Sequence, residues 1–155
     1  MKKLGNVREK VILYQRHDTS IDWSREMPTE NWLLMAIADN KPSTVLDEIA
    51  RKSIDKDVCY VCCLGNQGEE LHDTFDENIV IREVGIEKAH LPDFDIMTTW
   101  HNDFEEGVWF AIFLARDEEQ EISTVLCLDA GKESSEEEIA ELIKKINEGW
   151  VPSEK

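Results

Sequence analysis

The segment WLLMAIADNKP, residues 32–42, decides the fold, because seven consecutive apolar residues end there at a cluster of turn-forming residues. A short, uninterrupted apolar run is typical of a strand that is buried on both faces of a parallel sheet. A second run of this kind, VCYVCCL at residues 58–64, ends at the turn 65–68. Two such strands with a helical stretch between them predict a βαβ unit.

Helical patterns follow both runs. Thr44 and Asp47 form a capping-box-like pair at the start of the first helix. A second helix is expected to begin at Glu69, and residues 79–81 fit either its last turn or an edge strand. The chain therefore continues the alternation of strand and helix.

A third strand is predicted over residues 94–99, and it leads into a helix over residues 105–115. Asp103 and Glu106 form the capping box of this helix. Beyond Gly107 the helix is apolar on nearly every face, which is typical of a helix in a core or in a subunit interface. The pattern predicts a homodimer contact through helix 105–115.

The last strand is predicted over residues 122–128, and the helix after it is the clearest element of the chain. Ser135 and Glu138 form its capping box, and Gly149 ends it. Strands that alternate with helices predict an α/β fold with a mostly parallel sheet of four to five strands and helices on both faces. The expected architecture is a Rossmann-like or flavodoxin-like three-layer sandwich.

The domain organisation follows from where the alternation starts and stops. Residues 32–150 are expected to form the single α/β domain. Residues 1–31 are expected to form an N-terminal arm whose apolar run 11–14 could add an edge strand, and residues 151–155 a tail. The N-terminus lacks the apolar core of a signal peptide, and no apolar run approaches the ~20 residues of a membrane span, so we expect a cytoplasmic protein without a membrane partner.

The charge balance is strongly acidic, with 17 basic against 34 acidic residues and a net charge of −17. Such a charge repels nucleic acid, because phosphate binding needs clustered Lys and Arg, so no nucleic-acid partner is expected. Solubility or adaptation to salt explains the acidity without any partner. The alternative is a protein that docks on a basic partner as an acidic inhibitor or nucleic-acid mimic.

Motifs for cofactors and metals are weak. The Gly65–Gly68 turn is neither a dinucleotide fingerprint nor a phosphate loop, so no cofactor is expected. Cys59 and Cys62 have the C-x-x-C spacing, but they lie within a predicted strand, where residues three apart face opposite sides. We therefore expect reduced core thiols and no metal site.

The candidate site lies at the end of the third strand. Ligands of open α/β sheets bind outside the carboxyl ends of the strands, and one of these ends carries an aromatic ring, a histidine and a carboxylate. A second histidine with neighbouring carboxylates, early in the second helix, could lie across the same crevice. The candidate residues are His72, Asp73, Asp76, Trp100, His101 and Asp103. A stacking ring beside a histidine suits a small ligand or general acid–base chemistry, whereas the alternative is that Trp100 and His101 only pack and hydrogen-bond locally.

Three segments resemble a small bacterial family known only as a domain of unknown function. The segments are a strand with a C-x-Y-V core, an H-D-x-x-D motif at residues 72–76, and an M-T-T-W-H-x-D motif at residues 97–103. The resemblance covers about residues 32–115 and groups the same candidate residues, but it implies no activity. One departure is Gly107, where a helix former such as Ala is expected, so the start of this helix could be looser.

The sequence favours a binding or regulatory module that uses the His72/Trp100/His101 face for a small ligand or a basic protein partner. The alternative from another class is a small hydrolase or transferase. In that enzyme His101 would be the general acid or base, Asp103 or Asp76 would orient it, and Trp100 would stack on a ring of the substrate. The catalytic residues are otherwise unknown.

Overall fold

A computed structural model describes residues 1–153. The strands are β1 (Lys2–Val7), β2 (Lys10–Arg16), β3 (Trp32–Ala38), β4 (Tyr60–Leu64), β5 (Met97–Trp100) and β6 (Thr124–Ala130). The helices are α1 (Ser43–Asp55), α2 (Gly68–Glu83), α3 (Phe104–Trp109), the π-helical turn η1 (Phe110–Leu114) and α4 (Glu136–Asn147). None of the helices in this described part is long and apolar enough to cross a membrane.

All the strands belong to one mixed sheet with the order β1-β2-β6-β3-β4-β5. The pairing is parallel throughout, except that β1 pairs antiparallel with β2 through the tight turn at Arg8 and Glu9. The sheet therefore has six strands rather than the expected four to five. The segment expected to be an arm contributes both β1 and β2, and β2 is an interior strand that pairs with β6.

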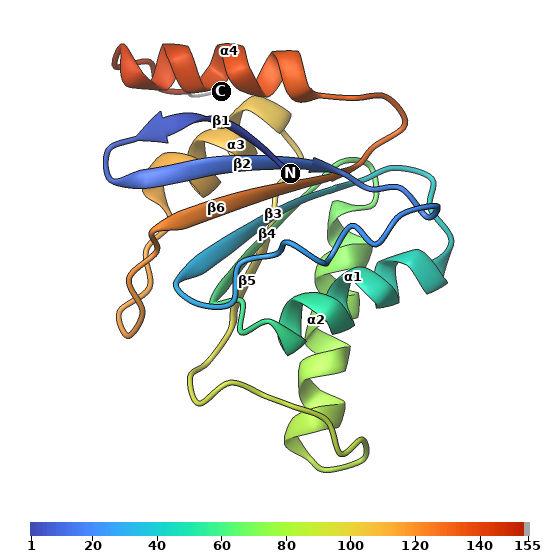
Figure 1. Ribbon diagram of the computed structural model, residues 1–155. Helices are drawn as coiled ribbons and strands as arrows, with labels where there is room; N and C mark the ends of the chain where they lie inside the picture. Colours follow the sequence, from blue (N-terminus) through green and yellow to red (C-terminus); the bar gives the residue numbers. More distant parts are fainter. Residues whose placement is uncertain (154–155) are drawn as a thin grey trace.

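Helices cover both faces of this sheet, as Figure 1 shows. α1 and α2 lie on one face together with Trp23 and Met27 of the segment between β2 and β3. α3, η1 and α4 lie on the other face. β3 and β4 separate the two cores, and their side chains are buried on both faces, which explains their uninterrupted apolar sequences. The α/β class with a mostly parallel sheet is thus confirmed.

The strand order differs from both Rossmann and flavodoxin orders. The chain moves outward through β3, β4 and β5, with α1 and α2 on one face, and then returns by way of α3 and η1 on the other face. It inserts β6 between β2 and β3, at the centre of the sheet. Crossovers between parallel strands are right-handed. The outward crossovers therefore place α1 and α2 on one face, and the crossover that returns to β6 places α3 and η1 on the other.

Several expected boundaries shift. The helix of residues 68–83 includes residues 79–81, so these do not form an edge strand. The expected Thr44 cap is wrong, because Pro42 is the N-cap residue of α1. The expected capping box at Ser135 does not form: Ser135 holds the N-cap position, but its side chain makes no cap hydrogen bond. The cap of α3 is confirmed, because the Asp103 carboxylate accepts a hydrogen bond from the Glu106 amide.

Candidate functional site

The topological switch point is the place where neighbouring strands of a parallel sheet are followed by connections to opposite faces. In this strand order it lies at the carboxyl end of β6, between β2 and β3. The chain leaves β2 and β3 toward the α1/α2 face but leaves β6 toward the α4 face, so a crevice opens where they separate. A hollow of about 520 Å³ lies at this place. Its lining comes from residues 16–19 after β2, and from residues 40–42 and Val45 around the start of α1. We call this hollow the switch-point crevice.

Asp129, at the end of β6, anchors the turn that leads from β6 to α4 and holds Arg16, which lines the crevice. Its fully buried carboxylate accepts hydrogen bonds from the Tyr14 hydroxyl (2.6 Å) and the Arg16 guanidinium (3.1 Å). The amides of Gly131 (2.9 Å) and Ser135 (2.8 Å) donate to the same carboxylate. Burial and the hydrogen bond to this carboxylate raise the pKa of Tyr14. With its four donors Asp129 holds the turn from β6 to α4, and we assign it a structural role.

The loops after β3 and β4 are tied together beside the crevice. The Gln67 side chain bridges to the backbone of Lys41, accepting from its amide and donating to its carbonyl oxygen at 2.8 Å each. The Asp39 carboxylate accepts from the Asn66 amide at 2.7 Å. Gly65 permits this close approach, because it has φ +89° and an added Cβ would lie 2.4 Å from the Ala38 carbonyl oxygen. The ties keep Lys41 in place at the rim.

The start of α1 borders the crevice at Pro42 and Val45, and its first amides carry partial positive charge. The other α-helices have acidic residues in their first turns, but α1 has none, and no side chain caps it. The amides of Ser43 and Thr44 donate to no residue of the described chain. Free amides and the helix dipole attract an anion to such a terminus. Lys41 adds positive charge at the rim, whereas the charge of Arg16 is already paired with Asp129.

His17 forms part of the crevice wall. Its ring packs against Trp23 with centroids 5.4 Å apart, and its Nε2 is buried without a hydrogen-bond partner among residues 1–153. Burial lowers the pKa of His17, so the imidazole is neutral at neutral pH. A buried, unpaired ring nitrogen costs free energy and is one of the groups that a bound ligand could satisfy. Asp18 follows it and is exposed at the rim of the crevice.

The structure places His101 in a different environment from the one expected. Its side chain is only 9% exposed, with Nδ1 2.8 Å from the Glu106 carboxylate and Nε2 3.0 Å from the Thr99 hydroxyl. Phe110 packs against the ring at 4.8 Å. Both ring nitrogens are therefore occupied, and Glu106 rather than Asp103 or Asp76 is the carboxylate paired with His101.

Gly107 explains why this region is tight rather than loose. A Cβ at this position would lie 2.9 Å from Leu64 Cδ2 and 3.0 Å from His101 Cβ. The expectation that glycine loosens the start of α3 is wrong, because the missing side chain lets the helix pack directly on β4 and on His101. The spacing between His101 and Glu106 depends on this contact.

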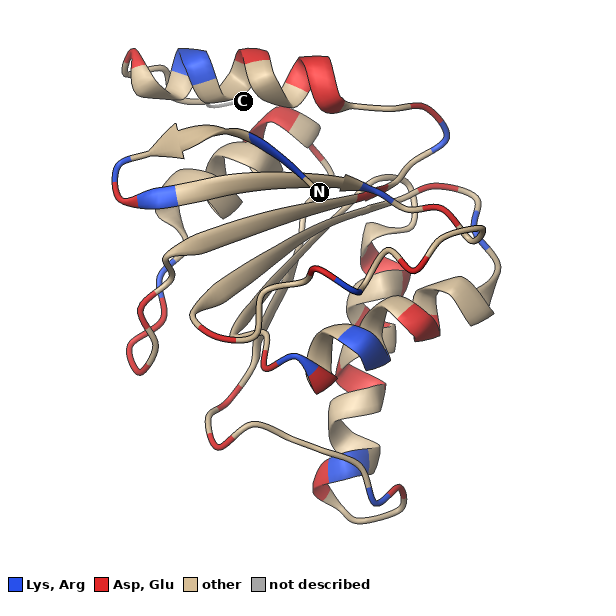
Figure 2. Cartoon of the chain, in the orientation of Figure 1, with Lys and Arg blue, Asp and Glu red and all other residues tan. Residues whose placement is uncertain are grey.

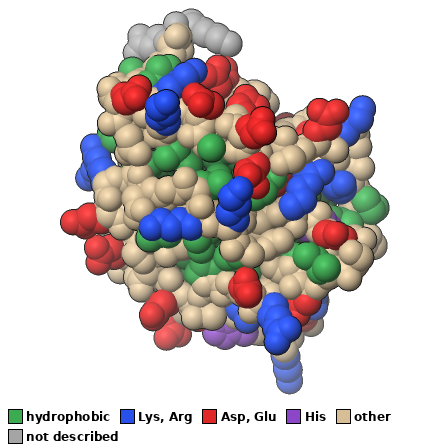
Figure 3. Space-filling model, turned by 45° about the horizontal axis from the view of Figure 1, so that its top comes forward, with side chains coloured by type: hydrophobic (Ala, Val, Ile, Leu, Met, Phe, Trp, Pro, Cys, Tyr) green, Lys and Arg blue, Asp and Glu red, His purple; other side chains and the backbone are tan. Residues whose placement is uncertain are grey.

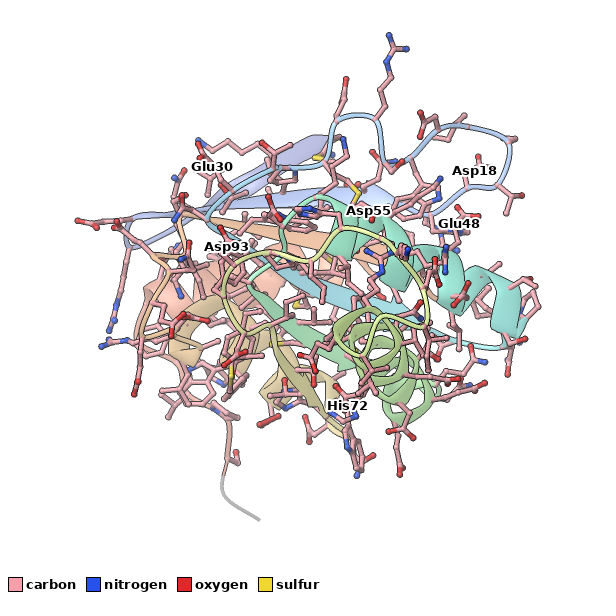
Figure 4. The ribbon with its side chains drawn as sticks, turned by 90° about the horizontal axis from the view of Figure 1, so that it is seen from below. Asp18, Glu30, Glu48, Asp55, His72 and Asp93 are labelled. Atoms are coloured by element: carbon pink, nitrogen blue, oxygen red, sulfur yellow. The ribbon has the colours of Figure 1, made fainter. Side chains whose placement is uncertain are left out.

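His72 lies on the opposite face of the sheet from His101. Thr98 and Trp100 alternate with Thr99 and His101 along β5, and Thr98 donates to Asp76 of α2 at 2.8 Å. His72 contacts Asp76 at 3.5 Å and Asp73 at 3.2 Å, and Figure 4 shows it far from Asp18 and Glu48. The structure thus brings His72, Asp73 and Asp76 together beside β5 but separates them from His101.

The thiols are all free and buried. Burial raises the pKa of Cys59 to about 11 and that of Cys62 to about 12. The expectation of reduced core thiols is confirmed. The expectation that Cys59 and Cys62 face opposite sides of a strand is wrong, because Cys59 precedes β4 and packs in the same core as Cys62. Within residues 1–153 no group of three or more His, Cys, Asp or Glu is arranged to hold a metal ion.

Sequence patterns did not point to the residues of the switch-point crevice. Arg16, His17 and Lys41 have no motif spacing, and they meet only because β6 inserts between β2 and β3. One available signal was the absence of acidic residues at the start of α1 in a chain that places them at its other helix starts.

The fold and the crevice together define a small α/β domain with a single mixed sheet, helices on both faces and a hollow at the switch point. The chain belongs to a family described as a domain of unknown function, DUF7684, whose model matches residues 10–146. The resemblance to an uncharacterised family is thereby confirmed. A search of curated proteins found no relative of this chain.

Proposed function

We propose that the protein is a binding module that takes a small anionic ligand, carrying a phosphate or carboxylate group, in the switch-point crevice. The observation that carries the proposal is the coincidence of the topological switch point with a hollow of about 520 Å³ at the uncapped start of α1. Ligand sites usually have volumes of ~300–1,000 Å³. We propose that the protein resembles Rossmann-like domains in one respect, which is that its ligand binds at the carboxyl ends of the strands.

Three groups are assigned roles in binding. The amides of Ser43 and Thr44 donate to the anion, as at other helix N-termini that bind phosphate. Lys41 supplies a positive charge from the rim. His17 Nε2 contacts the body of the ligand, which would satisfy its missing hydrogen bond.

An NMR titration with inorganic phosphate, and then with a sugar phosphate, tests this proposal. We expect the amide resonances of residues 16–19, of Lys41 and of residues 43–45 to move together and to saturate. Lys41→Gln should weaken binding by roughly tenfold, since one charge-assisted contact contributes on the order of 1.4 kcal/mol. Lys144→Gln on exposed α4 is the matched control and should bind like the wild type. Shifts that do not saturate, or equal affinity in both variants, would refute the proposal.

A second candidate function is docking of a basic segment on the face formed by α2 and β5. β5 is an open edge strand, and Trp100 and Met97 are 38% and 47% exposed on it. Exposed acidic residues of α2 border this edge, and they include Asp73 and Asp76. An exposed aromatic residue beside carboxylates suits a Lys-rich or Arg-rich peptide that pairs with the edge.

Titration with a lysine-rich peptide, followed by tryptophan fluorescence, tests this second candidate. We expect saturable binding that weakens in Trp100→Ala and in Asp73→Lys, with a glutamate-rich peptide as the negative control. Binding that survives both substitutions would assign the peptide to another surface. Figure 2 shows acidic residues over both helical layers and many loops, a distribution that gives nucleic-acid mimicry no particular support.

The other expected functions stay predictions. The hydrolase or transferase has less support, because both nitrogens of His101 already have partners. The homodimer through residues 105–115 would have to centre on Leu114, which is 46% exposed, because Val108 and Ile112 are fully buried within one chain. Sedimentation of the wild type and of Leu114→Glu at the same concentration measures that association.

A further inference from the structure

A second hollow, of about 510 Å³, lies at the opposite end of the sheet from the switch-point crevice. The turn of the β1–β2 hairpin and the loop that leads from η1 into β6 form its walls, and these segments lie at the left of Figure 1. The apolar part of its lining comes from Phe113, Ala115 and Ile122. We call this hollow the hairpin cavity.

Three cations converge on the hairpin cavity, namely Arg8, Lys10 and Arg116. Burial lowers the pKa of Lys10, and the charges of Arg116 and Arg8 lower it further, so both arginines lie close enough to repel the Lys10 ammonium. Acidic residues outnumber basic ones two to one in this chain, yet none of the three cations forms an ion pair with a residue of the described part.

The lining also holds three acidic residues, which balance the formal charge, but none of them forms an ion pair with the three cations within the described residues. The acidic residues are Glu9, Asp117 and Glu121. The Asp117 carboxylate accepts from the amides of Glu119 and Gln120 and so holds its own loop together. Unpaired like charges that are held close in a folded protein are unfavourable unless an anion joins them.

The surrounding structure holds two of the cations, Arg8 and Lys10, in place. Arg8 lies over the Phe113 ring, 4.1 Å from its centroid, at a hairpin turn where its own φ is +54°. Lys10 Nζ donates to the carbonyl oxygens of Ile112 (3.4 Å) and Ala115 (3.2 Å) at the end of η1. π-helical turns such as η1 are rare and occur frequently at functional sites. Figure 3 shows basic side chains lying beside hydrophobic patches on the surface with the top of Figure 1 turned forward.

We propose that the hairpin cavity is a binding site for a small organic anion, with the carboxylate or phosphate group on Arg8, Lys10 and Arg116 and an apolar body against Phe113, Ala115 and Ile122. Arginine matches both groups, because its planar fork can donate two parallel hydrogen bonds. This site is independent of the switch-point crevice, from which it differs in lining residues and in the apolar body that it accepts.

Benzoate and phenyl phosphate are the probes, and benzyl alcohol is their neutral counterpart. In an NMR titration we expect both anions to shift the amides of residues 8–10 and 113–117 and to bind at least tenfold more tightly than benzyl alcohol. The stronger of the two anions identifies the acidic group that the site prefers. Equal binding of the neutral probe, or no shift at these residues, would overturn the proposal.

Two substitutions locate the charge that matters. Arg8→Asn removes a cation and suits the positive φ of the turn, because asparagine tolerates this conformation. Arg116→Gln changes an exposed residue. Each should weaken benzoate binding, followed at residues 8–10 and 113–117, about tenfold, while Lys144→Gln on α4 should leave it unchanged. Wild-type affinity in both arginine variants would overturn the proposal, and the response of Lys41→Gln to inorganic phosphate would still test the first site separately.

Discussion

At the scale of single residues, Gly65 shows how a backbone constraint supports the switch-point crevice. Its φ of +89° and the 2.4 Å that would separate an added Cβ from the Ala38 carbonyl oxygen both oppose a side chain. We expect Gly65→Ala to lower the free energy of unfolding by about 2–4 kcal/mol, from the left-handed conformation together with the clash. Chemical denaturation followed by tryptophan fluorescence measures this loss.

Gly85→Ala is the matched control for that substitution. Gly85 also has a positive φ, +77°, but nothing lies within 4 Å of an added Cβ. Its cost should therefore be only that of the backbone conformation, about 1 kcal/mol. Equal costs at the two positions would show that contact with Ala38 does not matter.

His17 makes the stability of the protein depend on pH. Because burial lowers its pKa below the usual 6.5, the folded state favours the neutral ring. The stabilisation is complete above pH ~6.5 and is lost as the pH falls through that value toward the lower folded pKa. Unfolding curves recorded between about pH 7.5 and pH 5 should thus show a steeper loss of stability in the wild type than in His17→Gln. Parallel losses would mean that other groups cause the dependence.

The buried thiols should not react in the native state. Burial raises their pKa values, and the thiolate is the reactive form. We expect no reaction of the folded protein with a thiol-specific colorimetric reagent, and reaction of all four cysteines once guanidinium chloride unfolds the chain. Rapid labelling of one thiol under native conditions would contradict the buried arrangement.

At the scale of elements, the start of α4 depends on a serine other than the expected one. The Ser134 hydroxyl accepts a hydrogen bond from the Glu136 amide. It also forms a hydrogen bond with the Tyr14 hydroxyl, with the two oxygens 3.0 Å apart. We expect Ser134→Ala to cost about 1 kcal/mol, as loss of a helix cap does, and Ser135→Ala to cost less than about 0.5 kcal/mol. Thermal unfolding of the two variants side by side measures the difference, and the opposite order would restore the capping box predicted from sequence.

The elements that the sequence predicted best are those with a single strong pattern. The strand over residues 32–38 was predicted to the residue, because seven apolar positions leave little choice of boundary. β5 was predicted as residues 94–99 but spans Met97–Trp100, since an edge strand is buried less and its pattern is weaker. The end of the helix at residues 105–115 widens into η1, which no periodicity of 3.6 residues can indicate.

At the scale of the whole molecule, the net charge of −17 opposes folding through self-repulsion. Sodium chloride screens charges over about 8–10 Å at moderate ionic strength, so we expect the melting temperature to rise as the salt concentration increases. An equal osmolality of a neutral solute such as glycerol is the control for effects unrelated to charge. A melting temperature that salt leaves unchanged or lowers would mean that local ion pairs outweigh the repulsion.

The candidate site was harder to predict than the fold, because it depends on strand order. Periodicity shows that a strand is buried but not which strand lies beside it, so the insertion of β6 next to β2 could not be inferred from the sequence. The sequence indicated that strands end near Asp39 and near Asp129. It did not indicate that these two strand ends lie side by side. Trp100 and His101 were selected for their chemistry, and they lie at the edge of the sheet.

The central position of β6 also has a consequence for biosynthesis. Residues 124–130 are made after β2, β3, β4 and β5, and β2 and β3 can be joined in the sheet only once β6 has left the ribosome. Until then the nascent chain exposes two unpaired strand edges, one of them on the fully apolar β3. The sheet is therefore completed only after residues 124–130 have been made, and the interval before that is when this domain depends most on cellular chaperones.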